Sequence, residues 1–171
     1  PQFLKTLSEL NADLFVVVAY GQILSKTLLA IPPLGCINVH ASLLPKYRGA
    51  APMQRALMDG ALETGVCVQK MVFKLDAGEV IDESRIPISA DCTLGELQET
   101  LCDLAKPLLL SVIRSYEQGI PVAEPQNESE ATFAAKIKPE EMQLFWDRDA
   151  LTLHNQIRAL SPRPGAWCSF F

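Results

Sequence analysis

The chain has 171 residues, of which 49% are hydrophobic and 20% are charged, and its formal net charge is -5. This composition predicts one globular domain and part of a second, and it argues against strong nucleic-acid binding by this segment alone. A bilayer-spanning helix is excluded, because the longest apolar run, residues 14–19, is far shorter than the roughly 20 residues required. The first ten residues show no secretory signal.

The first part of the chain follows an α/β pattern. A helix is expected before residues 13–20, which form a β-branched, continuously apolar run that suits a strand buried on both faces of a parallel sheet. Residues 36–40 (CINVH) are a second such run. Residues 23–35 between them can hold a short helix that Pro32 and Pro33 would stop. Strand, helix and strand therefore predict a parallel crossover unit.

The next elements are marked by proline and glycine. Pro52 suits the first turn of a helix that Gly60 would end. Residues 64–73 and 79–88 read as paired strands, because the sequence KLDAG between them favours a tight turn.

Helical periodicity returns after residue 92. Thr93 and Glu96 predict a capping box, and Pro107 is expected to kink or divide the helix that follows. The polar stretch 125–132 reads as a linker. Beyond it, an amphipathic helix is predicted with Ala150, Leu153, Ile157 and Leu160 on one face, and residues 161–171 turn into the start of a strand.

The five cysteines have no spacing that suits a zinc site. They stand at positions 36, 67, 92, 102 and 168. An odd number in apolar surroundings predicts reduced, buried thiols, no metal and a cytoplasmic location.

A cluster of polar residues follows the strand 36–40. Asn38 and His40 are two positions apart, so their side chains project to the same face of that strand, near its carboxyl end. Pro45 stiffens the loop beyond, and Gly49 allows a close backbone approach. Imidazole can move a proton or stabilise an oxyanion, and Asp76 is the carboxylate best placed in the sequence to orient it.

Simpler interpretations of the same residues remain open. Asn38 and His40 could form a structural pair, and Asp76 could be a turn former. Ser42 could cap a backbone amide. The loop charges Lys46 and Arg48 read as solvated, and His154 reads as a helix-surface or interface residue. A dinucleotide-binding fold is rejected, since GxGxxG is absent.

The motif Asn-x-His-x-Ser-Leu-Leu-Pro, with glycine four residues later and a downstream Leu-Asp-x-Gly, resembles the formyltransferase family that uses 10-formyltetrahydrofolate. The runs TFAAKI (132–137) and IRALSPRPGAW (157–167) are similar to the members that act on initiator methionyl-tRNA. The resemblance implies an α/β, Rossmann-like domain with a mostly parallel sheet, followed by the start of an OB-like β-barrel. It divides the chain into a catalytic domain truncated at its N-terminus (1–124), a linker (125–138) and the beginning of a truncated C-terminal domain (139–171), so we expect a fragment.

The resemblance also implies the site. The family's catalytic residues fall on Asn38, His40 and Asp76, and its tetrahydrofolate-binding loop falls on Ser42, Leu43, Leu44 and Pro45. The implied reaction moves a formyl group from 10-formyltetrahydrofolate to the methionine amine of initiator tRNA, without a metal and in a monomer. The family's tRNA contacts lie mainly outside this segment.

Two alternatives remain open. One is another formyltransferase or a hydrolase on the same domain, with a nucleotide sugar, a ribonucleotide amine or water as acceptor. The other is a non-catalytic folate-binding module.

Overall fold

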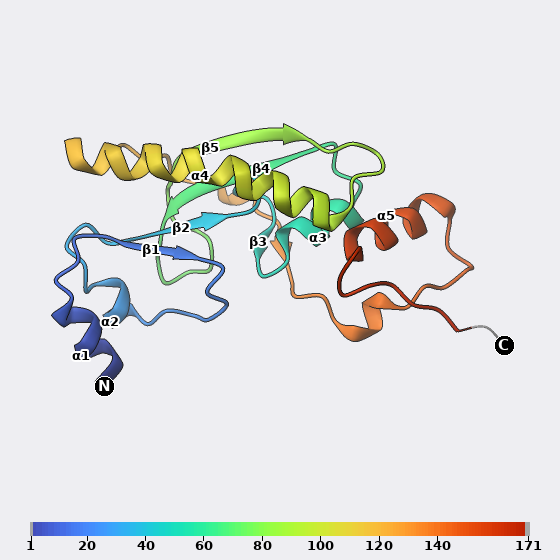
Figure 1. The fold of residues 1–171 in the computed structure, drawn as a ribbon, viewed down its shortest axis with the longest axis horizontal. Coiled ribbons are helices and arrows are strands. Elements are labelled where there is room, and N and C mark those ends of the chain that lie inside the picture. The colour runs from blue at the N-terminus through green and yellow to red at the C-terminus, as the bar shows by residue number, and fades with distance from the viewer. Residues whose placement is uncertain (1, 170–171) are drawn as a thin grey trace.

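The structure is a computed structural model that describes residues 2–169. Its larger sheet has four strands in the order β1, β2, β4, β5 (Figure 1). The strands are β1 Phe15–Val18, β2 Cys36–His40, β4 Glu63–Lys70 and β5 Val80–Pro87. β1 and β2 run parallel, whereas β4 runs antiparallel to both β2 and β5. The sheet is therefore mixed.

The prediction of a mostly parallel sheet is wrong for these strands. An apolar run reports burial and carries no information on strand direction. After β2 the loop at residues 41–51 and the short helix α3 (Pro52–Met58) do not carry the chain back along the sheet. β4 consequently begins at the end of the sheet where β2 stops.

β1 is exposed on one face, which also corrects the sequence prediction. Phe15 and Val17 pack with the helices α1 (Gln2–Glu9) and α2 (Lys26–Leu29). Val16 and Val18, on the other face, are 41% and 56% exposed. Among the described residues β1 pairs only with β2, so it is an edge strand. The predicted crossover from β1 through α2 to β2 is confirmed.

The predictions based on proline and glycine are confirmed. Pro52 occupies the first turn of α3, and Gly60 follows the helix with a φ of +67°. β4 and β5 pair as antiparallel neighbours around the connection at residues 71–79. This connection places Asp76 beside the end of β2.

The longest helix, α4 (Leu94–Gln118), covers β4 and β5 (Figure 1). Its predicted capping box between Thr93 and Glu96 is present. The helix passes through Pro107 without being divided. Proline removes one backbone hydrogen bond there, but Leu101, Leu108 and other apolar residues on both sides are buried in the same core, and that packing holds the helix together.

The segment after α4 lies against the sheet domain. It contains the 3-10 turn η1 (Glu128–Glu130) and β6 (Phe133–Ala134), which pairs in parallel with β3 (Arg48–Gly49). The turn η2 (Pro139–Met142) follows. The polar composition of residues 125–132 predicted a linker. Residues 126–134 nevertheless make specific contacts with the loop after β2.

The predicted C-terminal helix is confirmed as α5 (Ala150–Leu160), which packs against α3. Its buried face differs from the predicted one, because Ile157 is 44% exposed and Arg158 is buried. Arg158 donates to the carbonyl oxygens of Leu57, Ser89 and Cys92. Of the strand expected after it, the described part contains only a bridge between Gln143 and Trp167, while residues 170–171 lie outside the described residues. Residues 139–169 form no barrel among themselves.

All five cysteines are free thiols. Cys36 and Cys67 are buried as predicted, whereas Cys102 is exposed. No helix in the described part of the chain has the length and hydropathy that crossing a bilayer requires.

Candidate active site

His40 ends β2 on the face of the sheet opposite α4. Ile37 and Val39 pack in the core with α4, so strand alternation turns Asn38 and His40 to the other face. His40 is buried, and its Nε2 lies 2.9 Å from the carbonyl oxygen of Tyr47. A carbonyl oxygen can only accept, so Nε2 carries a hydrogen. Nδ1 is therefore the ring nitrogen available for chemistry.

Asp76 faces that nitrogen from the connection between β4 and β5. Its Oδ2 lies 3.8 Å from His40 Nδ1, an ion-pair distance when the imidazole is protonated. The same oxygen accepts a hydrogen bond from the Gly49 backbone N–H at 2.9 Å, and Oδ1 accepts from Gln69 Nε2 at 2.9 Å. The carboxylate is thus fixed by two donors beside the imidazole.

The backbone conformation that directs the Gly49 N–H to Asp76 is open to Gly49 because this residue has no side chain. Its φ is +123°, and a Cβ atom there would lie 2.7 Å from the carbonyl oxygen of Ala134 in β6. The predicted close backbone approach at Gly49 is confirmed, and the pairing of β3 with β6 fixes the direction of its N–H.

The four residues of the predicted folate loop have different surroundings. Ser42 is fully buried and donates from Oγ to the carbonyl oxygen of Lys46. The backbone N–H of Leu44, also buried, donates to Cys67 Sγ at 3.4 Å. Leu43 and Pro45 are partly exposed, and together with Leu44 they line a cavity of about 210 Å³. The polar groups of this loop therefore hold its shape.

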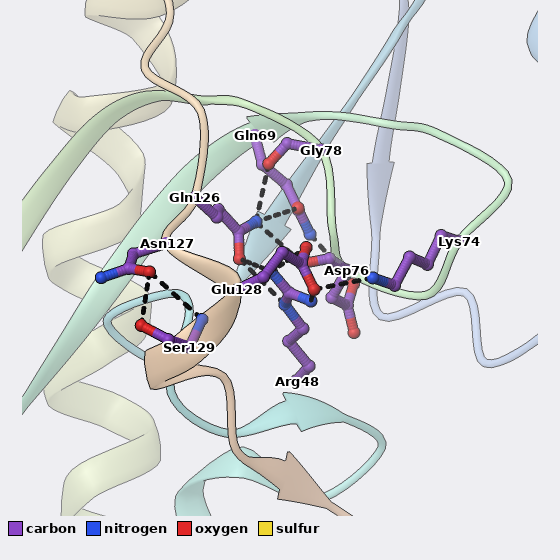
Figure 2. Close-up of polar contacts among 9 residues, drawn as sticks. All are labelled: Arg48, Gln69, Lys74, Asp76, Gly78, Gln126, Asn127, Glu128 and Ser129. Carbon is purple, nitrogen blue, oxygen red and sulfur yellow. Dashed lines mark hydrogen bonds and ion pairs between the residues drawn. The ribbon is translucent and has the colours of Figure 1, made fainter.

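Arg48 is wrongly predicted as a solvated charge, because it is only 1% exposed. Its Nε and Nη2 donate to Gln126 Oε1 at 2.9 and 2.7 Å, and Nη1 and Nη2 donate to the two carboxylate oxygens of Glu128 at 3.2 and 3.1 Å (Figure 2). The segment after α4 thus covers the loop and supplies the partners that a buried guanidinium requires. Lys46 is exposed, as predicted.

Sequence reasoning missed Gln69 and Gln126. Gln69 pairs in register with Asn38 and therefore shares its face of the sheet. A glutamine inside the apolar run 64–73 was a signal, but its partner depended on the strand register. Gln126 gave no signal, because glutamine is ordinary in a polar connection.

His154 and Glu128 are two further titratable side chains outside the His40–Asp76 pair. His154 Nε2 contacts the carbonyl oxygen of Ala90 at 2.9 Å, which agrees with a helix-surface role. Hydrogen bonds from Arg48 and Lys74 lower the pKa of Glu128 to about 2. Within residues 2–169, no three side chains among His, Cys, Asp and Glu gather as metal ligands would.

Two segments of the sequence match described families. Residues 1–113 match the family described as "Formyl transferase", and residues 136–170 match "Formyl transferase, C-terminal domain". The chain is 48% identical over 166 residues to the methionyl-tRNA formyltransferase of Protochlamydia amoebophila, covering 97% of this chain and 52% of that protein. It is 51% identical over 167 residues to the methionyl-tRNA formyltransferase of Symbiobacterium thermophilum, covering 98% and 51%.

The fold has counterparts among solved structures. The crystal structure of HypX from Aquifex aeolicus in complex with tetrahydrofolic acid superimposes with a TM-score of 0.84 at 19% identity, over 98% of this chain and 29% of that one. The chain spans about half the length of the curated relatives it matches. From the family match over residues 1–113, the chain belongs to the formyl transferase family.

Proposed function

We propose that the protein containing this segment transfers the formyl group of 10-formyltetrahydrofolate to the amino group of methionine on initiator tRNA. Relatives that are 48% and 51% identical over nearly the whole segment are methionyl-tRNA formyltransferases, which supports this acceptor. The reaction would serve translation initiation in the cytoplasm. Within the family, other acceptors would use the same catalytic domain, so the acceptor needs a direct test.

The observation that carries the proposal is the approach of His40 Nδ1 to the fixed carboxylate of Asp76. Nε2 is engaged by Tyr47, so a protonated His40 presents its Nδ1–H toward the reacting group. That cation would stabilise the negative charge that develops on the formyl oxygen as the amine attacks the formyl carbon. Asp76 would stabilise the imidazolium and accept the proton that the amine loses. As the bond from the formyl carbon to N10 breaks, that proton would pass to N10 of the departing tetrahydrofolate.

Asn38 is the third proposed catalytic residue. Strand alternation sets it on the face that carries His40, and its amide can donate a hydrogen bond without changing its charge. It would donate to the same formyl oxygen. Two donors on one oxygen would favour the transition state over the ground state, where that oxygen carries less charge.

The surroundings of residues 42–45 fit a partial contact with the folate. The co-substrate supplies the formyl carbon, and Leu43 and Pro45 offer apolar surface at a cavity of about 210 Å³. A pocket for a whole drug-sized ligand is typically about 300 Å³ or larger, so this cavity would take one part of the molecule. We assign folate contact to Leu43 and Pro45, and support of the loop to Ser42 and Leu44, whose polar groups are engaged within the protein.

The proposed domain boundaries are those predicted from the sequence, and the connection between the domains is given one additional role. Residues 1–124 would form the catalytic domain, residues 125–138 the connection, and residues 139–171 the beginning of a second domain. Because Gln126 and Glu128 contact the catalytic loop, the connection would also support the site. We propose that the protein acts as a monomer and that most tRNA contacts lie outside this acidic segment.

The test is a formyl-transfer assay with the full-length protein and 10-formyltetrahydrofolate. Initiator methionyl-tRNA, an amino sugar nucleotide, a ribonucleotide amine and water would compete as acceptors. Formyl-methionyl-tRNA should be the dominant product. Formylation of either small amine, or hydrolysis alone, would contradict the proposed acceptor. Folate binding without any transfer would instead indicate a non-catalytic module.

A further inference from the structure

Gln126 lies against the turn that carries Asp76, fifty residues away in the sequence. Its Nε2 donates to the carbonyl oxygens of Asp76 at 2.8 Å and Gly78 at 2.6 Å (Figure 2). The same nitrogen lies 3.4 Å from Gln69 Oε1. One side-chain amide from the segment after α4 thus fixes both sides of the turn.

Arg48 sets the orientation of the Gln126 amide. Two guanidinium nitrogens donate to Gln126 Oε1, so a flipped amide would place its N–H groups against a buried cation. Glu128 balances that cation and also receives Lys74, which precedes Asp76 in the same turn. The positive charge of Arg48 therefore forces Nε2 of Gln126 toward the two carbonyl oxygens.

Gln69 connects the oriented Gln126 amide to the Asp76 carboxylate. Its Oε1 faces Gln126, so its Nε2 points to Asp76 Oδ1 at 2.9 Å. Gln126 thereby acts on the main chain of Asp76 directly and on its side chain through Gln69. Both effects direct Oδ2 of Asp76 toward Gly49 and His40.

The turn needs such support. Asp76 has a φ of +45°, in the left-handed region that a residue with a side chain adopts less readily than glycine. A Cβ atom on Gly78 would lie 1.6 Å from the carbonyl oxygen of Lys70, so the turn is pressed against β4. A strained turn packed this closely depends on a few specific hydrogen bonds to fix the position of its carboxylate.

We propose that Gln126 is a positioning residue, which holds the Asp76 carboxylate at the distance from His40 that formyl transfer requires. This inference rests on the proposed function, because it assigns a purpose to the placement of Asp76. It assigns no contact with substrate to Gln126. Its proposed effect on turnover passes through Asp76, and that property distinguishes it from a residue that merely stabilises the fold.

The kinetic test uses the full-length protein and a double-mutant cycle. Gln126→Glu keeps an oxygen for Arg48 but places a second oxygen against the carbonyls of Asp76 and Gly78. Gln126→Met keeps the length of the side chain and removes both polar groups. A misplacement of roughly 1 Å should lower kcat by about 100-fold, while the KM for 10-formyltetrahydrofolate stays within about threefold of the parent value.

The cycle repeats Gln126→Met in the Asp76→Asn background. If Gln126 acts through Asp76, the second substitution should cost less than about threefold in kcat there. An equal loss in both backgrounds, or parental kcat in both Gln126 variants, overturns the proposal. Asn127→Ala is the matched control, because Asn127 belongs to the same segment and its side chain accepts hydrogen bonds from the backbone N–H and the hydroxyl of Ser129. This control should retain the parental kcat.

Crystal structures of the variants separate this inference from the proposed function. In Gln126→Glu, or in Gln126→Met if the first variant does not fold, the contact between Gly49 N and Asp76 Oδ2 should lengthen from 2.9 Å to beyond about 3.5 Å. A contact that stays at 2.9 Å overturns the positioning role whatever the enzyme does. An Asp76→Asn variant with parental turnover would instead contradict the catalytic role of Asp76, and the structures would still decide the role of Gln126.

Discussion

His40 uses one ring nitrogen to hold its own loop and presents the other to Asp76. The contact between Nε2 and the Tyr47 carbonyl restricts the rotation of the ring and determines which nitrogen carries the hydrogen in the neutral form. In the proposed reaction, an imidazole fixed in this way would be preorganised for charge stabilisation, because little reorientation would be needed when the transition state forms.

Replacing His40 by alanine tests this role. His40→Ala should lower kcat for formyl transfer by about 100-fold or more, the usual range for loss of a positioned acid or base. Folate affinity, measured by fluorescence titration, should be nearly unchanged, since the assigned folate contacts are Leu43 and Pro45. His154→Ala is the control, because His154 lies on α5 and contacts Ala90 and Asp91. Parental turnover in His40→Ala would remove His40 from the mechanism.

Cys67 is a second residue whose chemistry follows from its surroundings. It pairs with His40 across β2 and β4, and its Sγ accepts from Leu44 N–H. Burial raises the pKa of its thiol to about 12, with a smaller contribution in the same direction from the nearby Glu83 charge. The thiolate is the reactive form, so Cys67 should be inert at neutral pH.

Alkylation of the native protein with iodoacetamide at pH 8, followed by peptide mass spectrometry, should therefore label Cys102 well before Cys67. Cys102 is exposed on α4, whereas Cys67 is buried. Unfolding in guanidinium should make the two thiols react at similar rates. Rapid labelling of Cys67 in the folded protein would show that the loop after β2 opens readily.

At the scale of elements, the short pairing of β3 with β6 connects the site to the segment after α4. This pairing consists of two residue pairs, Arg48 with Phe133 and Gly49 with Ala134. Within it, Arg48 N–H donates to Thr132 O, and Ala51 N–H donates to Ala134 O. The pairing of β3 with β6, two residues each, thus determines where the Gly49 donor to Asp76 lies.

Gly49→Ala tests the importance of that pairing. The added Cβ would meet the Ala134 carbonyl at 2.7 Å, and the φ of +123° is unfavourable for alanine. We expect a loss of about 1–3 kcal/mol in the free energy of unfolding, measured in urea, together with a marked loss of kcat. Gly119→Ala is the matched control, because Gly119 has a φ of +141° with no atom within 4 Å of the added Cβ. Equal effects of the two substitutions would show that backbone strain alone is responsible.

At the scale of the whole molecule, two glutamates that follow α4 form ion pairs with residues from the first half of the chain. Glu128 pairs with Arg48 and Lys74, and Glu141 pairs with Arg55 of α3. Hydrogen bonds from Arg55 and then from the Lys138 backbone lower the pKa of Glu141 to about 2, as Arg48 and Lys74 do for Glu128. Both carboxylates are ionised in the folded protein well below their ordinary titration range.

These shifts predict acid sensitivity. A carboxyl group whose pKa is near 4.5 when unfolded and about 2 when folded stabilises the fold fully above about pH 5. Its contribution falls as the pH drops toward 2, because the unfolded chain takes up the proton first. Denaturant unfolding between pH 5 and pH 2 should therefore show a smaller free energy of unfolding at the acidic end.

The variants Glu128→Gln and Glu141→Gln should each flatten this pH dependence. Glu99→Gln, an exposed residue of α4, is the control and should leave the slope as in the parent. A parental slope in both test variants would mean that the ion pairs of Glu128 and Glu141 are weak in solution.

Much of the local structure was predictable. The strands 36–40 and 64–73, the start of α3 at Pro52 and the cap of α4 at Thr93 follow from hydrophobic period, proline and capping chemistry. These signals act over a few residues, which is why they can be read without a fold. The motif around His40 and Asp76 was also visible in the sequence, although its roles stay a proposal.

The sequence by itself determined most of the elements and singled out the residues that we propose to be catalytic. Only the tertiary structure decided that the sheet is mixed, that Arg48 is buried, and that Gln126 contacts the Asp76 turn. The physical reason is the distance along the chain over which each signal acts. Periodicity and capping report how a residue relates to its near neighbours in the chain, whereas Arg48 and Gln126 are 78 positions apart. Their contact depends on the path of the backbone through β3, β6 and α4, and that path is set by the packing of the whole core.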